Sequence, residues 1–179
     1  MIETAKDKFA DTIGCVEVGK MLRKKYLDPE SVFYAPDYFK GSAAPEHTEA
    51  EAYELMLLGV NQAICEGKRM VLIDGQPRTL GQLSLIKKDF ERTSVVICHI
   101  FATTKVRRAR AILRDINRDE RLLTDARMQG DLPAIYEVLT MSGFAGMTIS
   151  DMLNHAPTKE DFRDSCVTFL QDSLDSLQK

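Results

Sequence analysis

One short apolar run that ends on a carboxylate constrains the fold of this chain more than any other feature. Residues 69–74 are rich in strand-forming side chains and stop at Asp74, which is typical of a buried parallel strand. The turn Gly75-Gln76-Pro77 follows, and a helix is predicted to begin around Thr79. In open α/β sheets, ligands bind just outside the carboxyl ends of the strands. The first candidates for a functional site are therefore Asp74, Arg78 and Gln82.

Length and composition are those of an ordinary globular domain. With 179 residues the chain can bury most of its apolar surface as one domain. The formal net charge of −3 argues against a dedicated nucleic-acid-binding surface. No apolar run reaches about 18 residues and no signal-peptide core is visible, so neither a membrane span nor secretion is predicted. The cysteines lack metal-ligand spacing and are expected to be free thiols in a reducing cytoplasm: Cys15, Cys65, Cys98 and Cys166.

The amino-terminal part contains a near match to a phosphate-binding loop. A helix is predicted over residues 3–13, with Gly14 as its C-cap. Residues 14–21 then nearly spell GxxxxGK[ST], with Met21 in place of the hydroxyl residue. A true phosphate loop directly follows a buried strand, whereas a charged helical segment is expected before this one. We therefore interpret the match as fortuitous and predict a second short helix over residues 19–26.

The order of the remaining elements predicts a parallel sheet. A second buried strand is expected at 94–101, and a strand, a helix and a strand in succession imply a right-handed crossover. His99 lies inside this strand, and we interpret it as a hydrogen-bonded core or edge residue. The other predicted elements are an irregular segment at 27–47, helices at 48–66, 79–91, 103–116 and 132–142, a short strand at 146–149, and a terminal helix from about Thr158.

Arginines recur along one predicted helix and its continuation. They are spaced by three, four, four and three residues: Arg107, Arg110, Arg114, Arg118 and Arg121. This spacing forms one stripe if the helix continues. The rigid guanidinium fork suits bidentate phosphate binding. Two other interpretations remain open, a solvated face balanced by nearby acids, and surface salt bridges without a ligand that contribute about 0–1 kcal/mol each.

Taken in order, these motifs resemble the adenylate kinase family of nucleoside monophosphate kinases. Residues 74–79, followed by Gln82, are similar to the family's D-G-F-P-R-T-x-x-Q, with Gln76 replacing the usual Phe. Weaker similarities follow the family's order: 18–23 to T-G-D-(apolar)2-R, 41–46 to the turn that contacts the acceptor base, 110–114 to the R-x-x-x-R pair beside the donor, and 132–136 to the stretch after the lid.

The resemblance implies an α/β fold of the P-loop nucleotide-kinase type, with a three-layer parallel sheet flanked by helices. It implies phosphoryl transfer from ATP to a nucleoside monophosphate, AMP in the best-known members, with Mg²⁺ as cofactor. In a single domain spanning 1–179, residues 24–66 would form the acceptor-binding insert and 115–131 a short lid.

The resemblance also implies individual roles at the site. Arg23 and Arg78 would clamp the α-phosphate of the acceptor, and Gln82 would read its base. Asp74 would hold Mg²⁺ through water. The remaining implied residues are Gly41 and Gly75 at the acceptor, Arg110 and Arg114 beside the transferring phosphoryl group, and Arg121 and Arg127 in the lid.

The resemblance breaks down at the amino terminus. Residues 1–4 fall where the family's phosphate loop ends, Ile2 takes the place of its lysine, and the strand before the loop is missing. One hypothesis is an enzyme whose strand and loop come from upstream or from another polypeptide. The other is a non-catalytic nucleotide-binding or assembly protein on a kinase scaffold. Either way, strand edges are expected to be open to a protein partner that completes the sheet.

Overall fold

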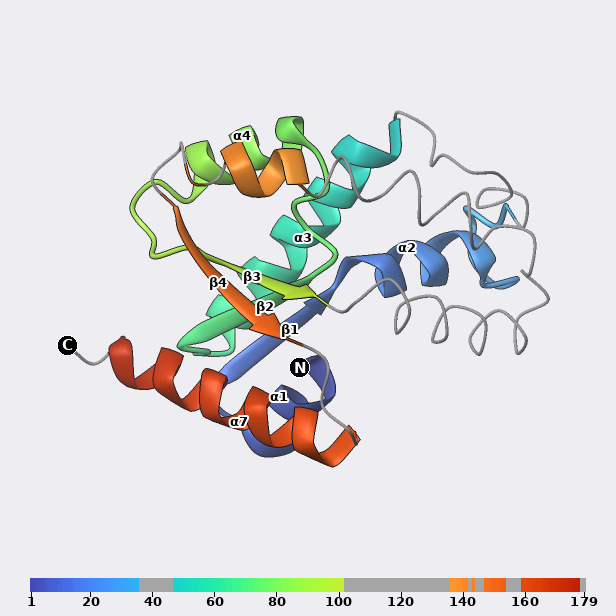
Figure 1. Ribbon diagram of the computed structural model, residues 1–179. Helices are drawn as coiled ribbons and strands as arrows, with labels where there is room; N and C mark the ends of the chain where they lie inside the picture. The colour runs from blue at the N-terminus through green and yellow to red at the C-terminus, as the bar shows by residue number, and fades with distance from the viewer. Residues whose placement is uncertain (36–46, 102–135, 142, 144–146, 154–158, 178–179) are drawn as a thin grey trace. The chain divides into compact units, whose positions relative to one another are not determined.

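The structure, a computed structural model, describes residues 1–35, 47–101, 136–141, 143, 147–153 and 159–177 (Figure 1). The chain divides into two compact units, each with one pair of strands. Unit 1 comprises residues 1–76 and 157–179, and unit 2 comprises residues 77–156. No helix in the described ranges is long and apolar enough to cross a membrane.

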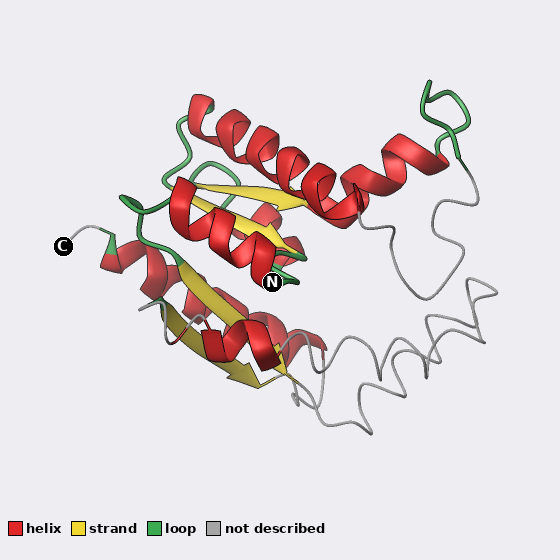
Figure 2. Ribbon diagram, turned by 90° about the horizontal axis from the view of Figure 1, so that it is seen from above, coloured by secondary structure: helices red, strands yellow, loops and turns green. Residues whose placement is uncertain are grey.

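Unit 1 is built around two parallel strands. β1 (Ile13–Glu17) pairs with β2 (Met70–Asp74), in a register that runs from Ile13 opposite Met70 to Glu17 opposite Asp74. Figure 2 shows the arrows of each strand pair pointing the same way. The helices of this unit are α1 (Ile2–Lys8), α2 (Val18–Leu27), α3 (His47–Cys65) and α7 (Lys159–Ser176).

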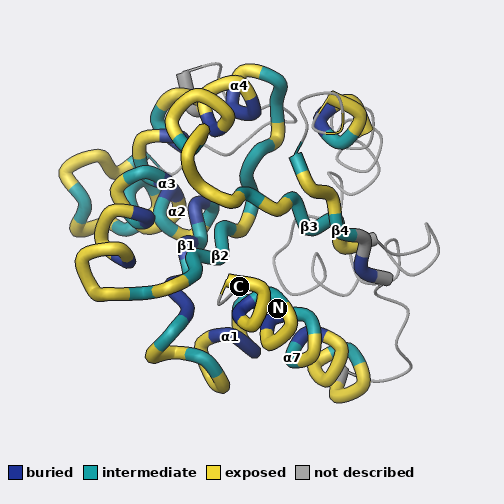
Figure 3. The backbone as a smooth tube through the Cα atoms, turned by 90° about the vertical axis from the view of Figure 1, so that its left-hand side faces the viewer, coloured by how far each residue is buried: buried dark blue, intermediate teal, exposed yellow. Residues whose placement is uncertain are grey.

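Helices cover both faces of this strand pair. Successive side chains of β1 point to opposite faces, so β1 packs against helices on both sides. On one face, Gly14 and Val16 meet α3: a Cβ added to Gly14 would lie 2.5 Å from the Cβ of Ala63, so the glycine permits close packing. On the other face, Ile13 joins Ala5 of α1 in a buried cluster that is completed by two residues of α7, Leu170 and Leu174. Figure 3 shows the buried positions of α1 and α7.

The prediction for residues 9–14 was wrong. The first helix ends at Lys8, and Gly14 is a strand residue rather than a helix cap. The buried positions of this segment alternate between helix-covered faces, which a helical pattern does not describe. The interpretation of residues 14–21 as a fortuitous match agrees with the structure for a different reason. β1 leads directly into α2 at Glu17 and Val18, so no loop separates strand from helix.

Unit 2 contains the second parallel pair. β3 (Val96–Phe101) pairs with β4 (Thr148–Leu153), and His99 of β3 is the register partner of Asp151. α4 (Leu80–Asp89) begins after Thr79, whose hydroxyl oxygen accepts the Gln82 backbone N–H at 3.3 Å. Residues 136–141 are helical and bury Val138.

The α/β class and most element positions are therefore confirmed, and each observed strand pair is parallel. The single parallel sheet predicted to join the strands at 69–74 and 94–101 by a crossover is not seen in the described residues. Within the described residues, β2 pairs with β1 and β3 pairs with β4, as two two-stranded sheets. The strands predicted at 69–74 and 94–101 form at Met70–Asp74 and Val96–Phe101, and the last strand runs beyond its predicted end to Leu153. The helix predicted at 103–116 and the lid at 115–131 lie outside the described residues.

Candidate functional site

The carboxyl edge of unit 1 brings two acidic residues to adjacent strand ends. Glu17 and Asp74 are the last residues of β1 and β2 and are register partners, so their backbones lie about 5 Å apart. Asp74 is exposed to solvent. Gly75 follows at φ +88°, a conformation that strains any residue with a side chain. The chain thus turns sharply directly after the Asp74 carboxylate.

The Glu17 carboxylate is neutralised by two lysines. Lys6 of α1 donates to it in an ion pair, and Lys20 of α2 lies 3.4 Å from the same Oε1 atom. The hydrogen bond from Lys6 lowers the pKa of Glu17, and the same bond raises the pKa of Lys6. Both groups therefore stay charged around neutral pH. Within the described residues, Asp74 forms no such ion pair, so it supplies the uncompensated negative charge of this edge.

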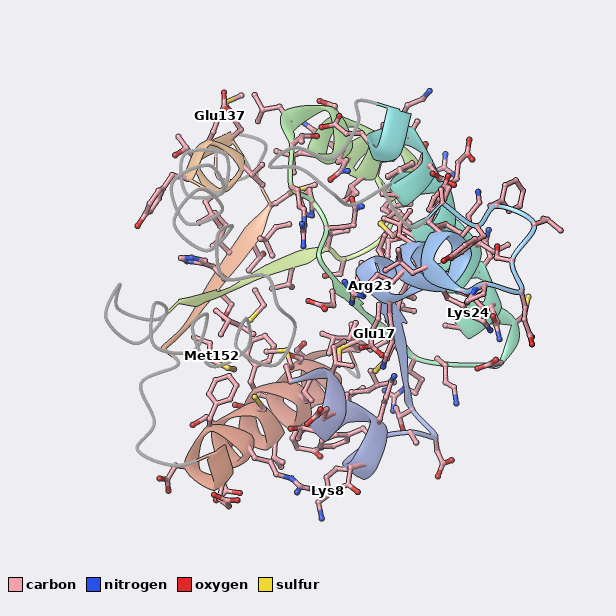
Figure 4. All side chains as sticks on the ribbon, turned by 90° about the vertical axis from the view of Figure 1, so that its right-hand side faces the viewer. Lys8, Glu17, Arg23, Lys24, Glu137 and Met152 are labelled. Carbon is pink, nitrogen blue, oxygen red and sulfur yellow. The ribbon has the colours of Figure 1, made fainter. Side chains whose placement is uncertain are left out.

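Arg23 is the cation best placed to meet an anion at this edge. It lies exposed on α2, and its Nη atoms are 3.6 and 3.8 Å from the position that a Cβ on Gly19 would occupy. The guanidinium group therefore folds back over the first turn of α2, next to the end of β1. Figure 4 labels Glu17 at that strand end, with Arg23 and Lys24 on α2. Adjacent helical residues are separated by about 100°, so Lys24 occupies a different side.

The thiol of Cys15 and the side-chain amide of Gln76 are the other polar groups near this edge. Burial raises the pKa of the Cys15 thiol, which keeps it protonated and a poor nucleophile. Gln76, two residues beyond Asp74, has a buried side-chain oxygen, Oε1, that accepts no hydrogen bond within the described structure. A buried acceptor without a donor is unusual in a native protein.

In unit 2, Gln82 is held by the start of its own helix. Its side chain is 4% exposed, and its Oε1 accepts the backbone N–H of Arg78 at 2.8 Å. Together with the bond from the Gln82 N–H to Thr79, this arrangement is close to a capping box. The Gln82 oxygen is therefore already bonded to the backbone at the start of its own helix. Arg78 is exposed.

The predicted site residues divide between the two units. Arg23, Asp74 and Gly75 belong to unit 1, and Arg78 and Gln82 belong to unit 2. The residues predicted at the site that lie outside the described ranges are Gly41, Arg110, Arg114, Arg121 and Arg127. Sequence reasoning missed Glu17, because Ile13 and Gly14 were assigned to a helix and its cap, and residues 15–17 were assigned to no helix or strand. The signal was present as an apolar run that ends on a carboxylate, the same pattern that located β2.

A magnesium role for Asp74 fits the residues in a limited sense. No group of three or more ligating side chains that could hold a metal ion occurs in the described part of the chain. Mg²⁺ typically keeps several waters and binds one or two carboxylates together with substrate phosphates. An exposed carboxylate such as Asp74 matches that mode, whereas it does not match a dedicated protein cage.

No model of a protein family matches the chain, and no curated protein matches it at a significant level. The function is therefore inferred from the residues themselves and from the geometry of the two strand ends.

Proposed function

We propose that this chain binds a nucleoside monophosphate at the carboxyl edge of β1 and β2, as the acceptor half of a nucleoside monophosphate kinase-like protein. One observation carries the proposal. Two parallel strands end side by side on Glu17 and Asp74, a positive-φ glycine follows Asp74, and the Arg23 guanidinium lies over the adjoining helix start. Such strand ends are where α/β proteins bind ligands, and the motif at 74–79 is the most specific in the sequence.

Each residue of unit 1 has a chemical task in this proposal. Arg23 donates to the phosphate oxygens, because its planar fork matches two of them at once. Asp74 would hold a magnesium ion through water, and the ion would neutralise negative charge on the phosphates. Glu17, already paired with Lys6 and Lys20, leaves the site less negative than two bare carboxylates would. An anionic ligand can then approach Arg23 without meeting both acidic groups uncompensated.

The proposal extends to phosphoryl transfer from ATP to the bound monophosphate. The expected catalytic arginines, Arg110 and Arg114, and the lid arginines, Arg121 and Arg127, would stabilise charge on the transferring group. The resemblance also assigns an acceptor role to Arg78, an exposed residue of unit 2. The resemblance also calls for a phosphate loop on the donor side, and the segment from Gly14 to Lys20 does not supply one, because it forms strand and helix without a loop.

That last observation favours a second candidate function, a non-catalytic nucleotide-binding or assembly protein. β2 pairs with a single strand within the described residues, and an apolar parallel strand normally has neighbours on both edges. A partner that contributes a strand would satisfy this edge by strand addition. The same acceptor residues would then serve recognition instead of turnover.

Two measurements separate these functions. Calorimetry measures the binding of AMP with and without Mg²⁺, and a coupled assay measures ADP formation from ATP and AMP. Arg23→Ala should weaken AMP binding about tenfold or more, since a charge-assisted hydrogen bond contributes about 1.5–3 kcal/mol. Lys24→Ala is the matched control, because it removes the same charge one position along α2. Asp74→Asn should abolish any dependence of binding on Mg²⁺, and Arg78→Ala tests unit 2 separately.

The outcomes are distinct. AMP binding with ADP formation supports the enzyme, and AMP binding without ADP formation supports the non-catalytic candidate. If no nucleoside monophosphate binds, the proposed function is wrong. Equal losses in Arg23→Ala and Lys24→Ala would show a general effect of charge, and would contradict the assignment of the phosphate to Arg23.

A further inference from the structure

A buried acceptor in the turn after β2 has no partner within the described residues. It is the side-chain oxygen Oε1 of Gln76. Burying such a group without a hydrogen bond costs free energy, and native proteins rarely leave one in that state unless a water, ion or ligand satisfies it. The group lies two residues beyond Asp74, in the turn that Gly75 opens at φ +88°. The orphaned acceptor is therefore within the segment that the proposed function assigns to the acceptor nucleotide.

The other glutamine of the same motif shows what a satisfied side chain looks like. Gln82 is 4% exposed, and its Oε1 accepts the Arg78 backbone N–H at 2.8 Å. A role in holding the helix start accounts for that glutamine. No backbone or side-chain donor in the described structure accounts for Gln76 in the same way. A ligand that brings its own donor would account for it.

The chemistry of the missing donor is restricted. An amide oxygen only accepts hydrogen bonds, so the group opposite it must carry an N–H or an O–H. A phosphate is mainly an acceptor at neutral pH, since its second pKa is about 6. The donor must therefore belong to the nucleoside part of the ligand, as an amino group of the base or a hydroxyl group of the sugar.

We propose that Gln76 is a specificity-determining residue that accepts a hydrogen bond from an amino or hydroxyl group of the acceptor nucleoside. The inference rests on the proposed function, because it assumes that a nucleoside monophosphate binds at this edge. It assigns Gln76 a task that differs from the phosphate-binding task of Arg23. The site then selects nucleosides with a donor at the right place over otherwise similar nucleosides without one.

Binding of three ligands to four proteins tests the inference. The ligands are AMP, purine riboside monophosphate, which lacks the amino group, and 2′-deoxy-AMP, which lacks one hydroxyl group. The proteins are the wild type, Gln76→Leu, Gln76→Glu, and the control Gln62→Leu, which removes an exposed glutamine of α3 that bonds Glu66, the residue just after the end of that helix. Calorimetry gives each affinity, and circular dichroism checks that each variant is folded.

The wild type and Gln62→Leu should bind AMP roughly 3- to 10-fold more tightly than one of the two analogues, the range expected for one neutral hydrogen bond. The analogue that loses affinity identifies the donor as amine or hydroxyl. Gln76→Leu should bind all three ligands within about twofold of one another. Gln76→Glu keeps an acceptor and should keep the preference, which guards against a variant that has merely lost its structure.

Two results would overturn the inference while leaving the proposed function intact. One is a preference that persists in Gln76→Leu, and the other is a wild type that binds all three ligands equally. A wild type that binds none of the three would instead overturn the proposed function, and the inference with it. The thermal stability of the ligand-free protein gives an independent readout. Gln76→Leu should not lower it, and a clear loss would show that the oxygen has a structural partner.

Discussion

Glu17 and Asp74 are register partners at the carboxyl ends of β1 and β2, yet their carboxylates have different surroundings. Lys6 and Lys20 surround Glu17, whereas Asp74 is exposed and has no ion pair within the described residues. Lys6 and Lys20 compensate the charge of Glu17. The exposed Asp74 carboxylate lies at the end of its strand, where a cation or a hydrated metal ion can approach it.

This arrangement predicts a dependence of stability on acidic pH. Lys6 lowers the pKa of Glu17 from 4.5, so the ion pair stabilises the fold above that value and is lost as pH falls through the lowered pKa. Glu17→Gln should reduce the free energy of unfolding at pH 7 by at most about 1 kcal/mol, because Lys6 is half exposed. The difference from the wild type should shrink toward about pH 3.

Urea denaturation of both proteins across this pH range measures the effect. Glu54→Gln, at an exposed position of α3, is the control and should show a smaller difference. At the alkaline end, Lys6 keeps its charge above its usual 10.5, so the contribution should persist to that pH before it is lost. A difference between Glu17→Gln and the wild type that grows as pH falls would contradict the ion-pair assignment.

The glycines of α3 and α2 predict opposite effects of the same substitution. A Cβ on Gly59 would lie 2.8 and 2.9 Å from the two methyl groups of Val16, a stiff and buried side chain. Overpacking of this kind costs about 1–3 kcal/mol, which exceeds the gain in helix propensity of about 1 kcal/mol. Gly59→Ala should therefore destabilise unit 1. Gly19→Ala meets nothing closer than 3.6 Å and should be neutral or slightly stabilising.

The double variant Gly59→Ala/Val16→Ala provides the check on mechanism. Removing the methyl groups of Val16 makes room for the new Cβ, so the loss in the double variant should be smaller than the sum of the two single losses. Urea midpoints of the four proteins measure this coupling. Strict additivity would show that the close contact between β1 and α3 is not the cause.

Part of the fold and of the site was predictable because local sequence patterns agree there with the tertiary structure. The run that ends at Asp74 and the cap at Thr79 are local signals, and both elements form where predicted. β1 was missed because five residues from Ile13 to Glu17 follow a helix closely, and its strand character depends on packing against α3 and α7. Tertiary contacts between distant segments override such a weak local signal.

The roles of the two glutamines show a similar limit. The sequence motif places Gln76 and Gln82 together near a strand end, and a resemblance assigns base reading to Gln82. Which of the two amide oxygens already accepts a hydrogen bond depends on backbone geometry at the start of α4. There the Arg78 backbone N–H donates to the side-chain oxygen of Gln82. No residue pattern encodes that distance. The orphaned oxygen of Gln76 is likewise a property of the folded turn.

The bond from Arg78 to Gln82 predicts a local effect that hydrogen exchange can resolve. Gln82→Leu removes the acceptor of the Arg78 backbone N–H, so that amide should exchange faster with solvent. The expected loss is about 0.5–2 kcal/mol of local stability at the start of α4, typical of a lost capping interaction. Gln82→Glu keeps an acceptor and should preserve protection. Thr79→Ala should unprotect the Gln82 amide instead, and equal exchange of the Arg78 amide in all three variants would contradict the assignment.

A polar cluster joins α2 to α3 and predicts that one hydroxyl group stabilises unit 1. The Tyr26 hydroxyl donates to Glu51, with oxygen–oxygen distances of 2.6 and 2.8 Å, and Lys25 forms an ion pair with the same carboxylate. The Lys25 ammonium also lies 4.4 Å from the Phe33 ring centroid. Because the Glu51 side chain is only 16% exposed, solvent replaces a lost donor poorly.

Tyr26→Phe should therefore lower the free energy of unfolding by about 1–3 kcal/mol, the range for a hydrogen bond to a charged group. Tyr34→Phe, at a side chain 47% exposed, is the matched control and should change it by less than about 0.5 kcal/mol. Urea denaturation measures both. Since α2 also carries Arg23, a loosened contact with α3 should weaken AMP binding in Tyr26→Phe, but less than Arg23→Ala does. Equal stability of the two tyrosine variants would exclude the cluster as the joint between these helices.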